Sequence, residues 1–201
     1  MKKSLFLLTL LIGATFCVYA QNDDSAPKIS AGFSVGVTTG THAADLPVAS
    51  GIHVKLEYPI SDNQVSLMLT AGYTGYVSSN GYSTGYSSYG GSYTNGTLVS
   101  FVPVEAGVRF YVFNKLFVQG DAGASFSLNS ASSGYTGQSV ALIVSPSAGY
   151  SIPFGSSRFG LDLSLGYEDR IESAGGVNQT SGYVMGSYNQ VVFRAAFKFG
   201  L

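Results

Sequence analysis

The chain has 201 residues and a formal net charge of −1, from ten Lys/Arg and eleven Asp/Glu. Charged residues make up only 10% of the sequence, against about 25% in soluble domains, and Gly and Tyr are abundant with 26 and 14 copies. Nothing here is basic enough to indicate a nucleic-acid partner. A soluble β-protein of this composition would have too few charged residues to cover its surface. The low charge content therefore favours lipid as the solvent around the protein.

The N-terminus predicts a cleavable secretory signal over residues 1–20. Two lysines are followed by an apolar run over 5–18 and then by a small residue, Ala20, as a signal of this kind requires. The run is shorter than the about 20 residues that a membrane-spanning helix needs. Cys17 would leave with the signal, and the bulk of Phe16 argues against lipidation at that cysteine. The mature chain would therefore have no cysteine chemistry.

Residues 21–28 are polar and read as a flexible periplasmic leader, which leaves 29–201 as one domain. Without the two signal lysines, eight Lys/Arg stand against eleven Asp/Glu, a formal charge of −3. No later apolar run is long enough for a transmembrane helix.

Alternation with a period of two predicts a strand wherever the mature chain is regular. The final segment shows it best, because Val191, Phe193 and Phe197 fall on one face while Arg194 and Lys198 fall on the other. The predicted strands, in chain order, are 29–37, 48–58, 64–77, 98–112, 116–128, 140–152, 158–168 and 190–201.

Connection lengths predict how these eight strands are joined. The segments between them are alternately long and short, and the longest is the polar stretch 78–97. Long outer loops and short periplasmic turns are typical of bacterial outer-membrane barrels, which also have even strand numbers. The sequence therefore predicts an all-β fold, an eight-stranded antiparallel up-and-down transmembrane β-barrel, with both termini on the periplasmic side.

Two arrangements share this alternation, and the polar rows distinguish them. A soluble lipocalin-like barrel would turn its apolar rows inward and its polar rows to water. The polar rows here are mostly Gly, Ser, Ala and Thr, too small and neutral for a solvated exterior but suited to the narrow lumen of eight strands. We therefore predict that the apolar rows face lipid. The aromatic residues near strand ends would form interfacial girdles: Tyr58, Tyr73, Phe110, Tyr150, Phe159, Tyr167 and Phe199.

The charged residues within strands fall on the predicted inner face. A buried charge is costly unless it is paired, so we expect a salt-bridged plug, with Arg109 and Asp121 paired across a hairpin. The alternative is a gate or narrow polar path. The predicted luminal residues are Lys55, Glu57, Glu105, Arg109, Asp121, Arg158, Asp162, Glu168, Arg194 and Lys198, with His53 in addition.

Catalysis and metal binding have little support in the sequence. The two histidines allow no Ser-His-acid set with known spacing and face, and no metal-ligand or cofactor motif is present. An outer-membrane hydrolase stays a second alternative, with His42, Asp169 and Glu172 as candidates at the rim.

The loop 78–97 is the best candidate for recognition. Tyr gives a large contact area at low entropy cost, and Gly and Ser give adaptability, as in antibody paratopes. The relevant tyrosines are Tyr82, Tyr86, Tyr89 and Tyr93. We therefore expect a structural or surface-interaction role for the barrel, with a narrow pore for small solutes as the first alternative.

Several segments resemble the PorT-like outer-membrane β-barrel family of Bacteroidetes. They are FVPVEAGVR at 101–109, FVQGDAGASF at 117–126, PSAGY at 146–150 and the C-terminal strand. That strand also resembles the one through which the barrel-assembly machinery recognises outer-membrane barrels, although it ends in Leu201 and not in an aromatic residue. The resemblance implies an outer-membrane barrel but no particular reaction, because the family has no shared one.

Overall fold

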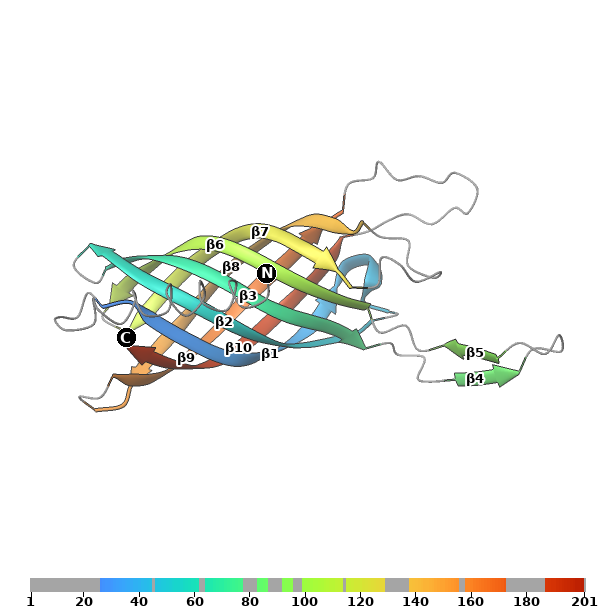
Figure 1. Cartoon of the computed structure of the whole chain (residues 1–201), viewed down its shortest axis with the longest axis horizontal. Coiled ribbons are helices and arrows are strands. Elements are labelled where there is room, and N and C mark those ends of the chain that lie inside the picture. Colours follow the sequence, from blue (N-terminus) through green and yellow to red (C-terminus); the bar gives the residue numbers. More distant parts are fainter. Residues whose placement is uncertain are drawn as a thin grey trace, which may run out of the picture.

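The computed structural model describes residues 26–44, 46–61, 64–77, 83–86, 92–95, 99–113, 115–128, 138–155, 158–172 and 187–200. The predicted signal and most of the leader lie outside these residues. Eight long strands form a closed antiparallel barrel (Figure 1). They are β1 (Lys28–Thr39), β2 (Val48–Ser61), β3 (Val65–Val77), β6 (Val99–Phe113), β7 (Leu116–Ser127), β8 (Val140–Pro153), β9 (Phe159–Ile171) and β10 (Tyr188–Gly200).

The barrel closes between its first and last strands. Around the circumference the order is β1-β10-β9-β8-β7-β6-β3-β2, and β1 pairs with β10 from Lys28↔Gly200 to Thr39↔Asn189. The long connections lie at one end of the barrel and the short turns at the other (Figure 1). The predicted eight-stranded up-and-down barrel is confirmed.

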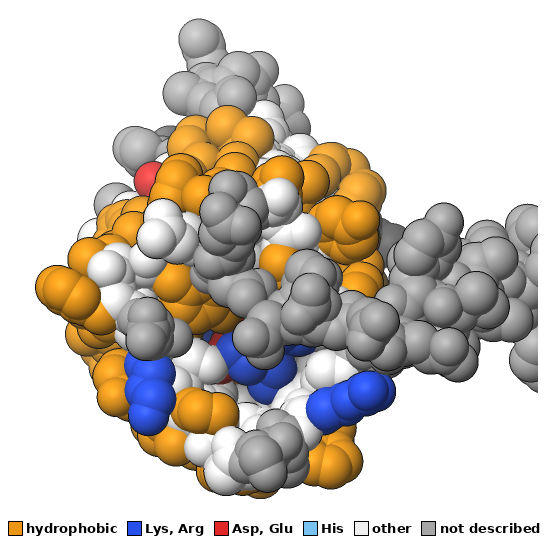
Figure 2. Space-filling model, turned by 90° about the vertical axis from the view of Figure 1, so that its left-hand side faces the viewer, with side chains coloured by type: hydrophobic (Ala, Val, Ile, Leu, Met, Phe, Trp, Pro, Cys, Tyr) orange, Lys and Arg blue, Asp and Glu red, His pale blue; other side chains and the backbone are white. Residues whose placement is uncertain are grey.

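The two faces of each strand are arranged as predicted. Outward-facing apolar residues are exposed, for example Leu165 at 60% and Phe197 at 58%, whereas Arg194 and Asp162 are buried. Seen from the short-turn end, hydrophobic side chains surround the barrel, and Lys and Arg side chains lie inside the ring and at its rim (Figure 2). Such an exterior requires an apolar solvent.

Inward-facing glycines leave space for large side chains of the neighbouring strand. A Cβ added at Gly107 on β6 would overlap Asp121 Oδ1 and the Gly120 carbonyl oxygen on β7, and one added at Gly149 would lie 2.5 Å from Phe117 Cζ. The narrow lumen is therefore packed by placing a large residue beside a small one.

Several predicted boundaries differ from the structure, and two of the differences bear on the candidate sites. The stretch 78–97, expected to be irregular, contains a two-stranded hairpin of β4 (Ser83–Tyr86) and β5 (Ser92–Asn95). The seventh barrel strand continues to Ile171 and does not end at Glu168, because β8 still provides partners there: Leu142 pairs with Ile171.

The remaining regular element is a short 3-10 turn, η1 (Gly40–His42), after β1. Among the described residues, no helix is long and apolar enough to cross a membrane.

The glycine packing makes a testable prediction about stability. We expect Gly107→Ala to lower the free energy of unfolding by about 1–3 kcal/mol, because the new methyl group overlaps Asp121. Gly120→Ala is the matched control: it lies on β7 almost opposite, faces outward, and has nothing within 4 Å of an added Cβ, so its effect should stay within about 0.5 kcal/mol. Urea unfolding in lipid vesicles measures both, and equal effects would contradict this packing.

Candidate functional site: the barrel lumen

The charged side chains predicted for the lumen are gathered there, with one exception. Eight of them are buried, and the Lys198 side chain is 12% exposed. The exception is Arg158, which precedes β9 and is exposed near the short-turn end. Its placement on the inner face was wrong because it lies in the turn, where the strand alternation does not yet apply. His53 is buried as expected.

The largest ion-pair network is centred on Arg109 and lies toward the short turns. Its Nη1 atom lies 2.7 Å from Asp162 Oδ2 and 3.0 Å from Glu57 Oε2. Lys198 Nζ lies 3.0 Å from Asp162 Oδ1 and 3.9 Å from Glu57 Oε2. These two cations and two anions come from β6, β9, β2 and β10. Of these strands only β9 and β10 are neighbours in the sheet, so the network joins distant parts of the barrel wall across the lumen. We call these four residues the Arg109 network.

Aromatic residues complete the surroundings of Arg109. Its guanidinium carbon lies 3.9 Å from the centre of the Phe117 ring, a distance typical of a cation–π contact. Tyr111 Oη donates a hydrogen bond of 2.8 Å to Glu57 Oε1 and accepts one of 3.2 Å from Arg109 Nη1. These contacts fix the Arg109 guanidinium, the Tyr111 hydroxyl and the Glu57 carboxylate relative to one another.

The expected direct pair between Arg109 and Asp121 is replaced by a bridge. Arg109 lies opposite Gln119 in the β6–β7 register, whereas Asp121 lies opposite Gly107. Arg109 Nε donates to Gln119 Oε1 at 2.9 Å, and Gln119 Nε2 donates to Asp121 Oδ2 at 2.5 Å. The amide therefore connects the two charges.

A second ion pair lies on β9 and β10. Arg194 Nη2 and Glu168 Oε2 are 2.5 Å apart, and Gln190 Nε2 donates to Glu168 Oε1 at 3.0 Å. Glu168 is the register partner of Gln190, so Arg194 reaches it along the strand.

Other buried polar groups have no such partners in the described part of the chain. No ion pair within 4.0 Å there involves Lys55, Glu105 or Asp121, although Lys55 interacts electrostatically with Asp121, Asp162 and the nearby arginines. Both ring nitrogens of His53, and Thr70 Oγ1, have no hydrogen-bond partner. In register, Lys55 lies opposite Thr70, and Thr70 lies opposite Glu105. Groups of this kind normally bind internal water.

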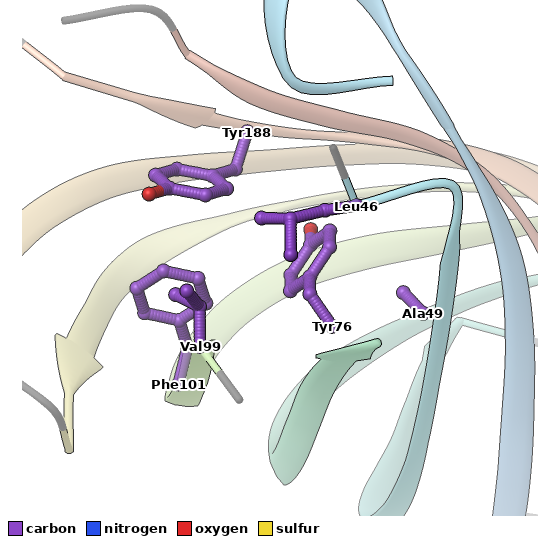
Figure 3. Packing of buried hydrophobic residues seen from close by; sticks show 6 residues of the cluster. All are labelled: Leu46, Ala49, Tyr76, Val99, Phe101 and Tyr188. Carbon is purple, nitrogen blue, oxygen red and sulfur yellow. The ribbon is translucent and has the colours of Figure 1, made fainter. Parts of the chain in front are cut away.

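An aromatic cluster fills the lumen near the long connections (Figure 3). We call it the outer cap; it consists of Leu46, Ala49, Tyr76, Val99, Phe101 and Tyr188. The rings of Phe101 and Tyr188 are 5.0 Å apart in an edge-to-face arrangement, and both contact Tyr76.

Arg170 also contacts the outer cap, although it is not among the luminal residues predicted from the sequence. Its guanidinium carbon lies 4.2 Å from the centre of the Phe101 ring, and it forms an ion pair with Glu172. The predicted strand 158–168 ends before Arg170, although the inward alternation of Asp162, Ser164, Gly166 and Glu168 continues to it directly. Extending that alternation by one step would have identified it.

The rim residues considered for hydrolysis do not form a catalytic set. The His42 ring stacks on Tyr188 with centres 4.2 Å apart, and Glu172 is buried in its ion pair with Arg170. Asp169 lies on β9 next to the outward-facing Tyr167 and accepts a 2.7 Å hydrogen bond from the Asn189 amide, oriented to donate. Within the described ranges no group of three His, Cys, Asp or Glu could hold a metal ion.

The recognition tyrosines are only partly within the described residues. Tyr86 ends β4 and Tyr93 lies in β5, where the register pairs Tyr93 with Gly85. Tyr82 and Tyr89 lie outside the described residues.

Comparison with solved structures agrees with this architecture. The chain is similar to neisserial surface protein A (NspA), with 13% identity, a TM-score of 0.51, and coverage of 87% of this chain and 97% of that one. The chain has the fold of an outer-membrane barrel. It is also similar to the attachment invasion locus protein Ail of Yersinia pestis, crystallised with the heparin analogue sucrose octasulfate, at 14% identity and a TM-score of 0.48, covering 86% and 97% of the two chains. No family model and no curated protein sequence matches the chain.

The Arg109 network makes a prediction about stability. We expect Arg109→Gln to cost about 3–5 kcal/mol of unfolding free energy. The buried carboxylates of Glu57 and Asp162 would then share Lys198 as their one remaining cation in the network. Arg158→Gln is the control at an exposed position and should change stability by less than about 0.5 kcal/mol. Combining R109Q with E57Q and D162N should restore part of the loss. Unfolding in lipid vesicles provides the measurement, and strictly additive losses would show that these groups are not coupled.

Proposed function

We propose that this protein is an integral outer-membrane barrel of the PorT-like kind, whose filled lumen supports a structure that projects from the membrane. The main supporting observation is the inside-out arrangement, with exposed apolar rows and buried ion pairs. A closed barrel also satisfies every backbone group without water, which the bilayer requires. Its route into the membrane would be assembly through β10, the C-terminal strand.

The surface-interaction role rests on the hairpin of β4 and β5. It extends past the end of the barrel from which the long connections emerge (Figure 1). The stretch that contains it is composed almost entirely of Ser, Gly, Tyr, Asn and Thr, a composition suited to binding. The hairpin would therefore present a partner surface outside the cell.

Single cysteines test both the location and the orientation, because the chain beyond Cys17 has none. We expect Thr94→Cys, on β5, to react with a membrane-impermeant maleimide in intact cells. Lys115→Cys, in the short turn before β7, should react only after permeabilisation. The protein should fractionate with the outer membrane and run as a compact band before boiling. A soluble periplasmic protein, or the reverse labelling pattern, would contradict the proposal.

The partner surface has its own test. A proximity-labelling enzyme inserted between β4 and β5, within residues 87–91, should mark a reproducible set of proteins on intact cells. Changing Tyr82, Tyr86, Tyr89 and Tyr93 to Ser should remove that labelling without changing the amount of folded barrel. Unchanged labelling would exclude the tyrosines as the contact residues.

A narrow path for small solutes is the second candidate. It is supported by the buried polar groups between the outer cap and the Arg109 network. Within the described residues, the ring nitrogens of His53 and the hydroxyl of Thr70 have no hydrogen-bond partner. Lys55 and Glu105 are buried there and form no ion pair within 4.0 Å in the same part of the chain. A filled plug predicts that the wild type gives no steady conductance in planar bilayers. Replacing Tyr76, Phe101 and Tyr188 by Ala should then open brief conducting states, because these rings block one end of the lumen. Steady conductance of the wild type would favour the pore over the plug.

A further inference from the structure

The lipid-facing surface has a groove over β6 to β9 with a volume of about 630 Å³. Its apolar lining includes Val108 and Phe110 on β6, Val118 on β7 and Tyr167 on β9. Phe110, Val118 and Tyr167 are exposed on the outside of the barrel. The groove is therefore continuous with the apolar exterior.

The floor of the groove is low because two residues with small outward-facing side chains lie side by side. Gly120 on β7 and Pro146 on β8 are register partners, and an added Cβ at Gly120 would meet nothing within 4 Å. The β8–β9 register also passes from Val144↔Asp169 to Ser147↔Gly166 without pairing Pro146, which has no N–H to donate. The low floor of the groove is thus a local property of β7 and β8.

The walls of the groove are held by contacts with neighbouring strands. With its amide oriented to pair with both neighbours, Asn189 accepts a 2.9 Å hydrogen bond from Tyr167 Oη. This bond limits the freedom of the Tyr167 ring, while Val118 lies opposite Phe110 in the β6–β7 register. A pre-formed groove loses less entropy on binding than a flexible one.

The position of the groove in the membrane indicates its occupant. Gly120 is four residues from Leu116, where β7 begins at the short-turn end. At about 3.4 Å per residue and a tilt of about 40°, it lies about 10 Å from that end along the membrane normal. This depth is within one leaflet of a hydrocarbon core about 30 Å thick, where the surrounding molecules are acyl chains. Water would find few polar partners on these walls.

We propose that this groove binds one acyl chain of a phospholipid from the leaflet on the short-turn side, so that this lipid is held by the barrel and does not exchange freely. The acyl chain would be held by van der Waals packing, because moving it from the surrounding lipid onto an apolar protein surface brings no hydrophobic gain. The rings of Phe110 and Tyr167 stand beside the floor at Gly120, so a chain in the groove would be contacted from the sides as well as from below.

The test uses the full mature chain, reconstituted in vesicles of palmitoyl-oleoyl phosphatidylethanolamine with a minor share of phosphatidylglycerol. After extraction into mild detergent, native mass spectrometry counts the phospholipids retained by each protein. We expect one retained phospholipid for the wild type. For Gly120→Leu, whose added Cβ meets nothing within 4 Å and whose side chain would occupy the groove, we expect the retained fraction to fall on the order of fivefold. Gly120→Ala should give an intermediate value.

The matched control is Ala31→Leu, which adds the same side chain on the exposed face of β1, away from β6–β9. It should retain lipid as the wild type does, and the compact unboiled band confirms that every variant is folded. Equal retention in all variants, or none in the wild type, would overturn the proposal. A dimer of the chain that Gly120→Leu dissociates would overturn it as well, by assigning the groove to a second copy.

Discussion

The pairing of β1 with β10 is the constraint on which the rest of this structure depends. In a bilayer an open sheet edge would leave backbone N–H and C=O groups without partners, at several kcal/mol each. Closure removes both edges along twelve residues of β1, from Lys28 to Thr39. Once the sheet is closed at eight strands, the lumen is so narrow that side chains fill it, and the Arg109 network and the outer cap follow from how they do so.

The lumen is organised in layers along the barrel. The Arg109 network lies toward the short turns and is neutral, because two cations face two carboxylates. The outer cap at the other end is aromatic, with Arg170 stacked on Phe101. Between these layers lie the charged groups that form no ion pair in the described residues, such as Lys55 and Glu105. Two packed layers therefore enclose a polar middle.

The outside of the barrel is less uniform than its apolar rows suggest. Its exposed large hydrophobic side chains are Val, Leu, Ile, Phe and Tyr, but the pair Gly120 and Pro146 lines a groove. The hairpin of β4 and β5 provides a second distinct feature beyond the rim. Lipid and a surface partner would therefore meet different parts of the same chain.

The sequence by itself determined the strand number, the topology and the two faces of each strand. These follow from the alternation of single residues and from connection lengths, both of which are local properties that survive errors in strand boundaries. The alternation alone was enough to predict that Arg109, Asp162 and Arg194 face inward.

Only the tertiary structure decided which of these residues meet. Arg109 pairs with Asp162, three strands away around the barrel, and not with Asp121 on the next strand. The curvature of the closed sheet sets that distance, and no local pattern encodes it. The same holds for Arg170, whose strand continues because β8 supplies partners, and for the groove, which requires Gly120 and Pro146 to meet across two strands.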